Sequence, residues 1–180
     1  MRVLIDACVL YPTVMREVVL GAARQGLFQP LWSERLLEEW ARAAARRGPV
    51  DEVQARGEVA LVRAAWPEAC VTPRAGDMAR IWLPDPNDVH VLAAAIAGSA
   101  DLILTSNAKD FPRNVLREEG LDRRDPDGFL HDLWLAHPEK VAAAAREVLL
   151  QAQQMDDVPH EMRPLLKKAR LPRLAKALSS

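Results

Sequence analysis

Two short runs of apolar, largely branched side chains most constrain how this chain can fold. Residues 3–5 read Val-Leu-Ile and residues 102–104 read Leu-Ile-Leu, which is the length and composition of a buried strand. The stretches between and after them have helical periodicity and helix-capping residues. Strands that alternate with helices favour a parallel sheet covered by helices. We therefore expect an α/β protein with a central, mostly parallel sheet.

The helix boundaries follow from capping and breaking residues. Asp85 suits the N-cap and Pro86 the first position of one helix, which Gly98 ends. We expect helices over residues 12–24, 33–47, 51–65 and 86–97, a further turn into a helix at residues 107–110, and two further short strands over residues 28–32 and 69–71.

The composition changes after residue 128. Residues 129–178 are expected to be entirely helical, with breaks near Pro138, Pro159 and Pro172. We therefore expect an α/β domain over residues 1–128 and an all-helical C-terminal extension over residues 129–180.

Composition restricts the compartment and the class of protein. The 24 basic and 25 acidic residues give a formal charge of -1, which argues against holding a polyanion by bulk charge alone. Two cysteines are too few for a disulfide framework or a four-thiolate zinc site. The apolar run at the start ends at Asp6, unlike a signal peptide, and no stretch has the roughly 18 apolar residues of a membrane span. We expect a soluble, cytoplasmic protein without membrane contact.

Several common catalytic motifs are absent from the sequence. It contains no G-x-G dinucleotide fingerprint, no H-E-x-x-H zinc motif and no G-x-S-x-G nucleophile elbow. The remaining candidates for chemistry are carboxylates.

Three of these carboxylates stand where a parallel sheet would gather them. Asp6 follows the first apolar run, Asp88 opens a helix, and Asp110 follows the second apolar run. Ligand sites in such sheets lie beyond the carboxyl ends of the strands. Oxygen ligands suit Mg²⁺, and such a cation can bind a phosphate, acidify water and shield developing charge. The pattern therefore indicates a metal-dependent phosphodiesterase.

Each carboxylate also has a structural explanation, and spacing alone leaves both open. Asp85 suits a helix cap better than a ligand, Asp88 suits a helix N-terminus, and Asp110 can form a capping arrangement with Asn107. Asp6 is the hardest to explain without a ligand, because a carboxylate at the rim of a sheet is costly to bury unless it is bonded. His90 suits a general base, but a structural or surface role is favoured.

Three segments, in order, resemble the PIN-domain family, the ribonuclease fold of VapC-type toxins. They are residues 3–12 (VLIDACVLYP), residues 33–40 (SERLLEEW) and residues 85–112, which begin DPNDVHVLAAAI and end DLILTSNAKDFP. The resemblance thus extends from residue 3 to about residue 112, and the third segment is its most specific part. It implies that residues 1–128 form a PIN-like nuclease domain.

The resemblance implies a catalytic, metal-binding set of acids. By position in the motifs, the set consists of Asp6, Glu39, Asp88 and Asp110. Glu38 is the alternate to Glu39. The fourth family acid normally follows a threonine by two positions, where this chain has Asn107, so Asp110 is expected to replace it. The auxiliary candidates are Glu38, Asp85, Thr105, Ser106 and Asn107; Thr105 or Ser106 could position a water molecule or a phosphate oxygen.

The function implied by the resemblance is a Mg²⁺- or Mn²⁺-dependent endoribonuclease, the toxin of a type II toxin-antitoxin system. Its partners would be RNA and a cognate antitoxin, with a homodimer as a further expectation. Two alternatives stay open: an RNA-processing nuclease without antitoxin, and a non-catalytic module that binds RNA or protein.

Basic residues offer a place for the RNA backbone. Residues 161–180 contain six basic residues and one acidic residue, and positive side chains bind phosphates. The same residues also suit helix C-termini. The RNA-binding candidates are Arg42, Arg46, Lys167, Lys168 and Arg170.

Overall fold

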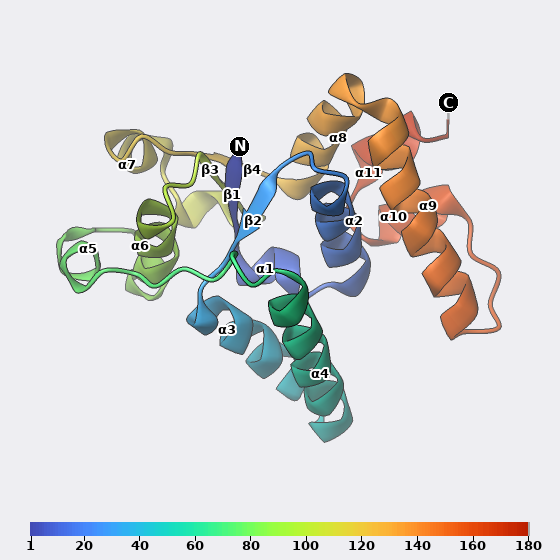
Figure 1. Ribbon diagram of the computed structural model, residues 1–180, viewed down its shortest axis with the longest axis horizontal. Coiled ribbons are helices and arrows are strands. Elements are labelled where there is room, and N and C mark those ends of the chain that lie inside the picture. Colours follow the sequence, from blue (N-terminus) through green and yellow to red (C-terminus); the bar gives the residue numbers. More distant parts are fainter. Residues whose placement is uncertain (180) are drawn as a thin grey trace. The chain divides into compact units, whose positions relative to one another are not determined.

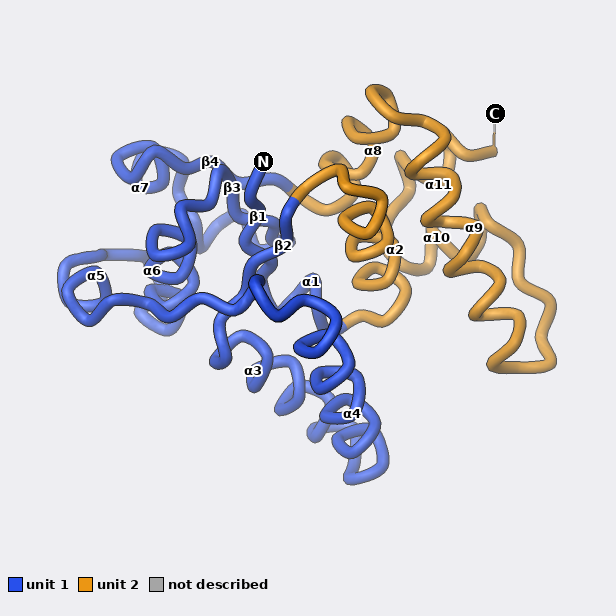
Figure 2. Tube along the Cα trace, viewed as in Figure 1, with its two compact units in different colours: residues 1–11, 29–124 blue, residues 12–28, 125–180 orange. Residues whose placement is uncertain are grey.

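A computed structural model describes residues 1–179, which form two compact units (Figure 2). Unit 1 consists of residues 1–11 and 29–124, and unit 2 of residues 12–28 and the chain from residue 125 onward. The expected division at residue 128 concerns which part carries activity, and it stays a prediction. No helix within residues 1–179 is both long and apolar enough to cross a membrane.

Unit 1 is built around a sheet of four parallel strands in the order β2-β1-β3-β4 (Figure 1). Val3 pairs with Pro30 on one side and with Leu102 on the other, and Leu102 pairs with Asp122. The parallel sheet is therefore confirmed, and all four strands end at the same edge. The strands are β1 (Arg2–Ile5), β2 (Gln29–Leu31), β3 (Leu102–Leu104) and β4 (Asp122–Arg124).

Helices connect these strands. Those of unit 1 are α1 (Ala7–Leu10), α3 (Glu34–Ala45), α4 (Pro49–Ala65), α5 (Ala75–Arg80), the 3-10 helix η1 (Pro86–Asp88), α6 (Val89–Ala97), the 3-10 helix η2 (Ala108–Asp110) and α7 (Arg113–Glu118). The short helices α1 and α5 and the strand β4 are additions to the elements expected from the sequence.

Local sequence explains where the expected elements begin. Ser33 starts α3, because its hydroxyl accepts a hydrogen bond from the Leu36 amide at 3.2 Å. Pro49 begins α4, two residues before the expected start, because the first position of a helix does not need an amide proton. The expected strand over residues 69–71 is wrong, since only a single bridge joins Cys70 to Trp32.

Helix α6 is almost fully buried and lies against the sheet. Gly98 ends it at a point where the chain approaches β2 closely. A Cβ atom at this position would lie 2.9 Å from Leu31 Cδ1 and 3.1 Å from Val71 Cγ1, closer than atoms normally pack. The absence of a side chain therefore lets the C-terminal end of α6 pack this near the sheet.

Unit 2 is entirely helical. Its helices are α2 (Thr13–Arg24), α8 (Pro126–Ala136), α9 (Pro138–Met155), α10 (Met162–Lys168) and α11 (Pro172–Ala177). The expected helical C-terminal region is thus confirmed, and Pro138 and Pro172 are the first residues of α9 and α11. Helix α2 joins this unit because it packs on α9, where a Cβ atom on Gly21 would lie 3.0 Å from Ala144 Cβ.

Candidate metal centre

Asp6 lies at the carboxyl edge of the sheet, directly after β1. It is only 8% exposed, and both of its oxygens accept hydrogen bonds. Oδ1 accepts one from the Ala7 amide at 2.7 Å, and Oδ2 accepts one from Thr105 Oγ1, also at 2.7 Å. Burial raises the pKa of Asp6, and the bonds from Thr105, Cys8 and Ala7 offset this only in part. The strand ends of β1 and β3 are thereby joined through one buried carboxylate.

Three further carboxylates form a cluster contributed by the two 3-10 helices. Asp85, Asp88 and Asp110 each offer a ligand oxygen, and these oxygens all lie within 4.8 Å of one another. Asp85 is also the cap of η1, because its Oδ1 accepts a hydrogen bond from the Asn87 amide at 2.9 Å. The structural and the ligand interpretations of Asp85 are therefore compatible, since a carboxylate has a second oxygen.

Asp88 is the electrostatic centre of this group. Its Oδ2 is buried and has no hydrogen-bond partner within residues 1–179. Burial and the negative charges of Asp6, Asp85 and Asp110 raise its pKa to about 6. Asp6 is not among the three clustered acids, but it is near enough to repel Asp88, so the four carboxylates form one coupled set.

The loop after β3 holds the fourth acid. The Asn107 side-chain amide donates a hydrogen bond to Asp110 Oδ2, and the Asn107 backbone amide donates one to Thr105 Oγ1 at 3.0 Å. Asp110 thus joins the cluster, whereas Asn107 orients it. Ser106 is exposed, and its backbone amide lies 3.4 Å from Cys8 Sγ.

The adjacent glutamates of α3 point in different directions. Glu39 contacts His90 and Arg35, and its charge raises the pKa of Asp6. Burial favours a higher pKa for Glu39 itself, but His90 and Arg35 outweigh burial and hold that pKa below its usual range. The structure therefore brings Glu39 near Asp6.

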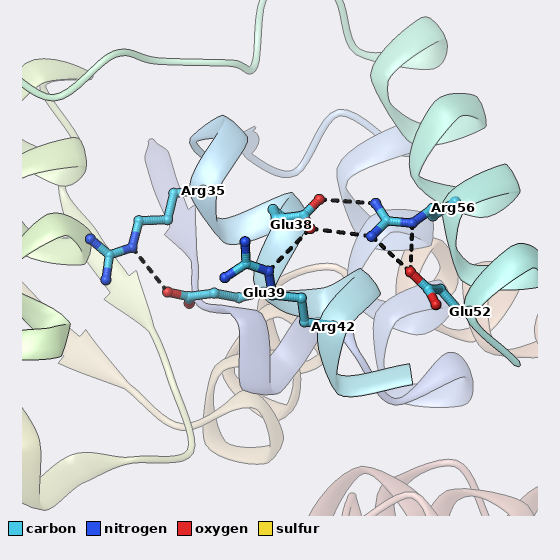
Figure 3. A network of polar contacts seen from close by, with 6 residues as sticks. All are labelled: Arg35, Glu38, Glu39, Arg42, Glu52 and Arg56. Carbon is cyan, nitrogen blue, oxygen red and sulfur yellow. Dashed lines mark hydrogen bonds and ion pairs between the residues drawn. The ribbon is translucent and has the colours of Figure 1, made fainter. Parts of the chain in front are cut away.

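Glu38 belongs to a surface network between α3 and α4 (Figure 3). It pairs with Arg56 at 2.9 Å and with Arg42 at 3.2 Å, and Arg56 also pairs with Glu52. Hydrogen bonds from these arginines lower the pKa of Glu38. Glu38 has no part in the group around Asp6.

The RNA-binding candidates all lie at the surface. Arg42 is bound to Glu38, with 73% of its side chain exposed, and Arg46 is the C-cap of α3. Lys167, Lys168 and Arg170 are exposed at and just beyond the end of α10 in unit 2.

Two residues of this region did not enter the expected acid set. Cys8 lies 3.3 Å from Asp6 Oδ2 through its sulfur atom, and desolvation together with the charge of Asp6 raises the pKa of the thiol to about 11. His90 is buried rather than at the surface, with Nε2 2.8 Å from Glu39 Oε1. Its place two residues after Asp88 is the sequence signal that could have connected it to the site.

The donor set fits a hard divalent cation. All the clustered donors are carboxylate oxygens, the type of ligand that Mg²⁺ and Mn²⁺ bind. Asp88 Oδ2 is buried without a partner among the described residues. His90 lowers the pKa of Asp88, but burial and the charges of the neighbouring carboxylates outweigh that effect. Asp85, Asp88 and Asp110 are the residues placed to hold the ion.

The parallel sheet and the acidic cluster at its edge define an α/β protein with a candidate divalent-cation site. A family model described as a PIN domain matches residues 2–109. Because that match covers more than half of the chain, the protein belongs to the PIN-domain family, as the resemblance indicated. PIN domains are generally nucleases that use divalent metals. No curated protein matched the chain, and no solved structure matched it.

Proposed function

We propose that this protein is a Mg²⁺- or Mn²⁺-dependent endoribonuclease that hydrolyses RNA phosphodiester bonds. The observation that carries the proposal is the group of four coupled carboxylates in which Asp88 Oδ2 is buried without a hydrogen-bond partner within residues 1–179. Folding brings these negative charges together at a cost in free energy, and a bound cation would offset that cost. The PIN-domain family supports RNA as the ligand of such a site.

In this mechanism the carboxylates of the chain place the reacting groups. Asp85, Asp88 and Asp110 would hold the cation, and Asp6 and Glu39 complete the acidic set. The ion, when bound, would supply Lewis acidity at the scissile phosphate. Thr105 fixes Asp6 by donating its hydroxyl proton, and the exposed Ser106 is available to a phosphate oxygen.

The reaction is an in-line displacement at phosphorus. A water oxygen forms the new bond to phosphorus while the bond to the leaving nucleoside oxygen breaks. The water gives up one proton to the solvent and the leaving oxygen takes one up from it, so one water molecule is consumed overall. The carboxylates repel the phosphate backbone, so basic side chains outside the site are needed to bring RNA to it. We assign that role to two separate groups: Arg42 and Arg46 of unit 1, and Lys167, Lys168 and Arg170 of unit 2.

The experiment that tests this proposal is cleavage of end-labelled RNA by the purified protein in Mg²⁺ or Mn²⁺. We expect cleavage that EDTA abolishes and that Asp6→Asn and Asp88→Asn reduce by at least about 10²-fold. Glu38→Gln is the matched control, because Glu38 is an acidic neighbour bound to Arg56; it should cut like the wild type. If Asp6→Asn cleaves RNA as well as the wild type does, the acidic-site hypothesis is wrong.

The biological role we propose is the toxin of a type II toxin-antitoxin system acting in the cytoplasm. Support comes from the resemblance of the three segments to VapC-type toxins. A short adjacent gene for a DNA-binding protein is expected, and its product should co-purify in a 1:1 complex and suppress cleavage. Cleavage without such a partner would favour the RNA-processing nuclease, and RNA binding without cleavage would favour the non-catalytic module.

The expected homodimer also stays a prediction. Sedimentation of the purified chain would check it, with a mass of about twice the 20.0 kDa of one chain as the expected result.

A further inference from the structure

His90 connects the first turn of α6 to α3. Its side chain is 3% exposed, and Nε2 lies 2.8 Å from Glu39 Oε1. His90 follows Asp88 by two residues, and Asp88 is the N-cap of α6. One helical turn therefore contributes both the central carboxylate of the acidic cluster and the contact to a glutamate on another helix.

The other ring nitrogen of His90, Nδ1, is not satisfied by a hydrogen bond within the described part of the chain. Nδ1 is buried and has no hydrogen-bond partner within residues 1–179. Burying an unsatisfied polar atom costs free energy, and an apolar side chain would fill the same space without that cost. Packing alone therefore does not explain a histidine here, whereas the bond from Nε2 to Glu39 does.

The hydrogen bonds to Glu39 leave one of its oxygens open. His90 and Arg35 both reach Oε1, at 2.8 Å and 3.3 Å. Neither His90 nor Arg35 is bonded to the other oxygen, Oε2. The two donors differ in surroundings: Arg35 is 52% exposed and His90 is 3% exposed, so only His90 is held in place by the packing around it.

We propose that His90 is a positioning residue that orients Glu39 toward the divalent cation. This inference rests on the proposed metal-dependent function. The imidazole donates its Nε2 proton to Oε1, which fixes the carboxylate plane and leaves Oε2 free to complete the acidic set around the ion that Asp85, Asp88 and Asp110 would hold. Partners of this kind orient metal ligands in many proteins. His90 does not act as the general base, because it is buried and directed at Glu39 rather than at solvent.

Substitutions at position 90 show whether any polar side chain is enough there, or whether its nitrogen must extend far enough to contact Glu39. The amide nitrogen of Gln lies about as far along the side chain as Nε2 of histidine, whereas that of Asn corresponds to Nδ1. We expect His90→Ala and His90→Asn to weaken Mn²⁺ binding about 10–100-fold, and His90→Gln to stay within about threefold of the wild type. Isothermal titration calorimetry with Mn²⁺ alone measures this without reference to cleavage.

A double-mutant cycle tests whether His90 acts through Glu39. In a Glu39→Gln background, His90→Ala should cause no further loss of Mn²⁺ affinity, because the group it orients has lost its charge. Arg35→Ala is the matched control, since it removes the exposed donor to the same oxygen; it should bind Mn²⁺ within about threefold of the wild type.

The outcomes separate this inference from the function on which it rests. If the wild type neither binds Mn²⁺ nor cleaves RNA, both proposals are wrong. If the wild type binds Mn²⁺ and His90→Asn binds it equally well, or His90→Gln binds it as weakly as His90→Ala, the positioning role alone is wrong. Thermal unfolding in EDTA identifies any variant that fails to fold. For variants that fold, the Mn²⁺ affinities of His90→Gln and His90→Asn then test the positioning role.

Discussion

Replacing Asp88 with asparagine should stabilise the metal-free protein at neutral pH. Asp88 is a half-buried carboxylate whose pKa is raised from 3.8 to about 6 by burial and by Asp6, Asp85 and Asp110. Its unpartnered Oδ2 shows that no hydrogen bond within residues 1–179 compensates that atom. Asparagine keeps the shape and removes the charge, so the repulsion within the cluster should decrease.

The size of this change in the free energy of unfolding, and the pH range over which it occurs, follow from the pKa of Asp88. Because the folded protein holds the Asp88 proton more tightly than the unfolded chain does, its stability falls as the pH rises from about 4 to about 6 and is constant above. A shift from 3.8 to about 6 corresponds to about 3 kcal/mol. Solvent screening of this half-buried group reduces that to about 1–2 kcal/mol.

Urea unfolding in EDTA at pH 7.5 and at pH 3.5 measures the effect. We expect Asp88→Asn to raise the free energy of unfolding by about 1–2 kcal/mol at pH 7.5 and to leave it unchanged at pH 3.5, where both side chains are neutral. Saturating Mn²⁺ should reverse the order at pH 7.5, since only the wild type gains from binding the ion. A variant that is less stable than the wild type in EDTA at pH 7.5 would refute the reasoning.

Three further substitutions test the supports of the fold and the site. Asp127→Ala should lower the free energy of unfolding by about 1.5–3 kcal/mol in urea titrations, because this buried carboxylate accepts hydrogen bonds from backbone amides at the start of α11. Gly98→Ala should cost about 1–3 kcal/mol in the same assay, because its Cβ would overlap Leu31. Thr105→Val should weaken Mn²⁺ binding about tenfold by calorimetry, because it removes the hydrogen bond to Asp6.

Three of the four strands could be predicted from the sequence, and the edge strand β4 could not. The strands β1 and β3 are central and fully apolar apart from Arg2, so their composition identifies them. The strand β4 reads Asp-Arg-Arg and lies at the edge. Its pairing depends on backbone hydrogen bonds to β3, which any side chain permits. Composition therefore has no information about it.

The acids of the site were predictable as candidates, but their division of roles was not. Glu38 and Glu39 are adjacent on α3, so they face directions about 100° apart. The neighbouring helices decide which glutamate joins the acidic set and which lies in the surface network. His90 of α6 contacts Glu39, and Arg56 of α4 contacts Glu38. Likewise, the sequence places Asp110 three residues after Asn107, but the hydrogen bond between their side chains appears only when the loop is folded.

The same architecture that creates helix caps also creates the acidic cluster. In a parallel sheet the chain turns into a helix after the strands at one edge, so acids that begin helices collect there. Acids that serve only as caps should have lowered pKa values, because amides and the helix dipole favour the charged form. Asp6 and Asp88 are N-caps by position, yet burial raises both pKa values, helped by the charge of Glu39 at Asp6 and by the charges of Asp6, Asp85 and Asp110 at Asp88. This opposite sign, rather than the number of acids, favours a cation site over a set of caps.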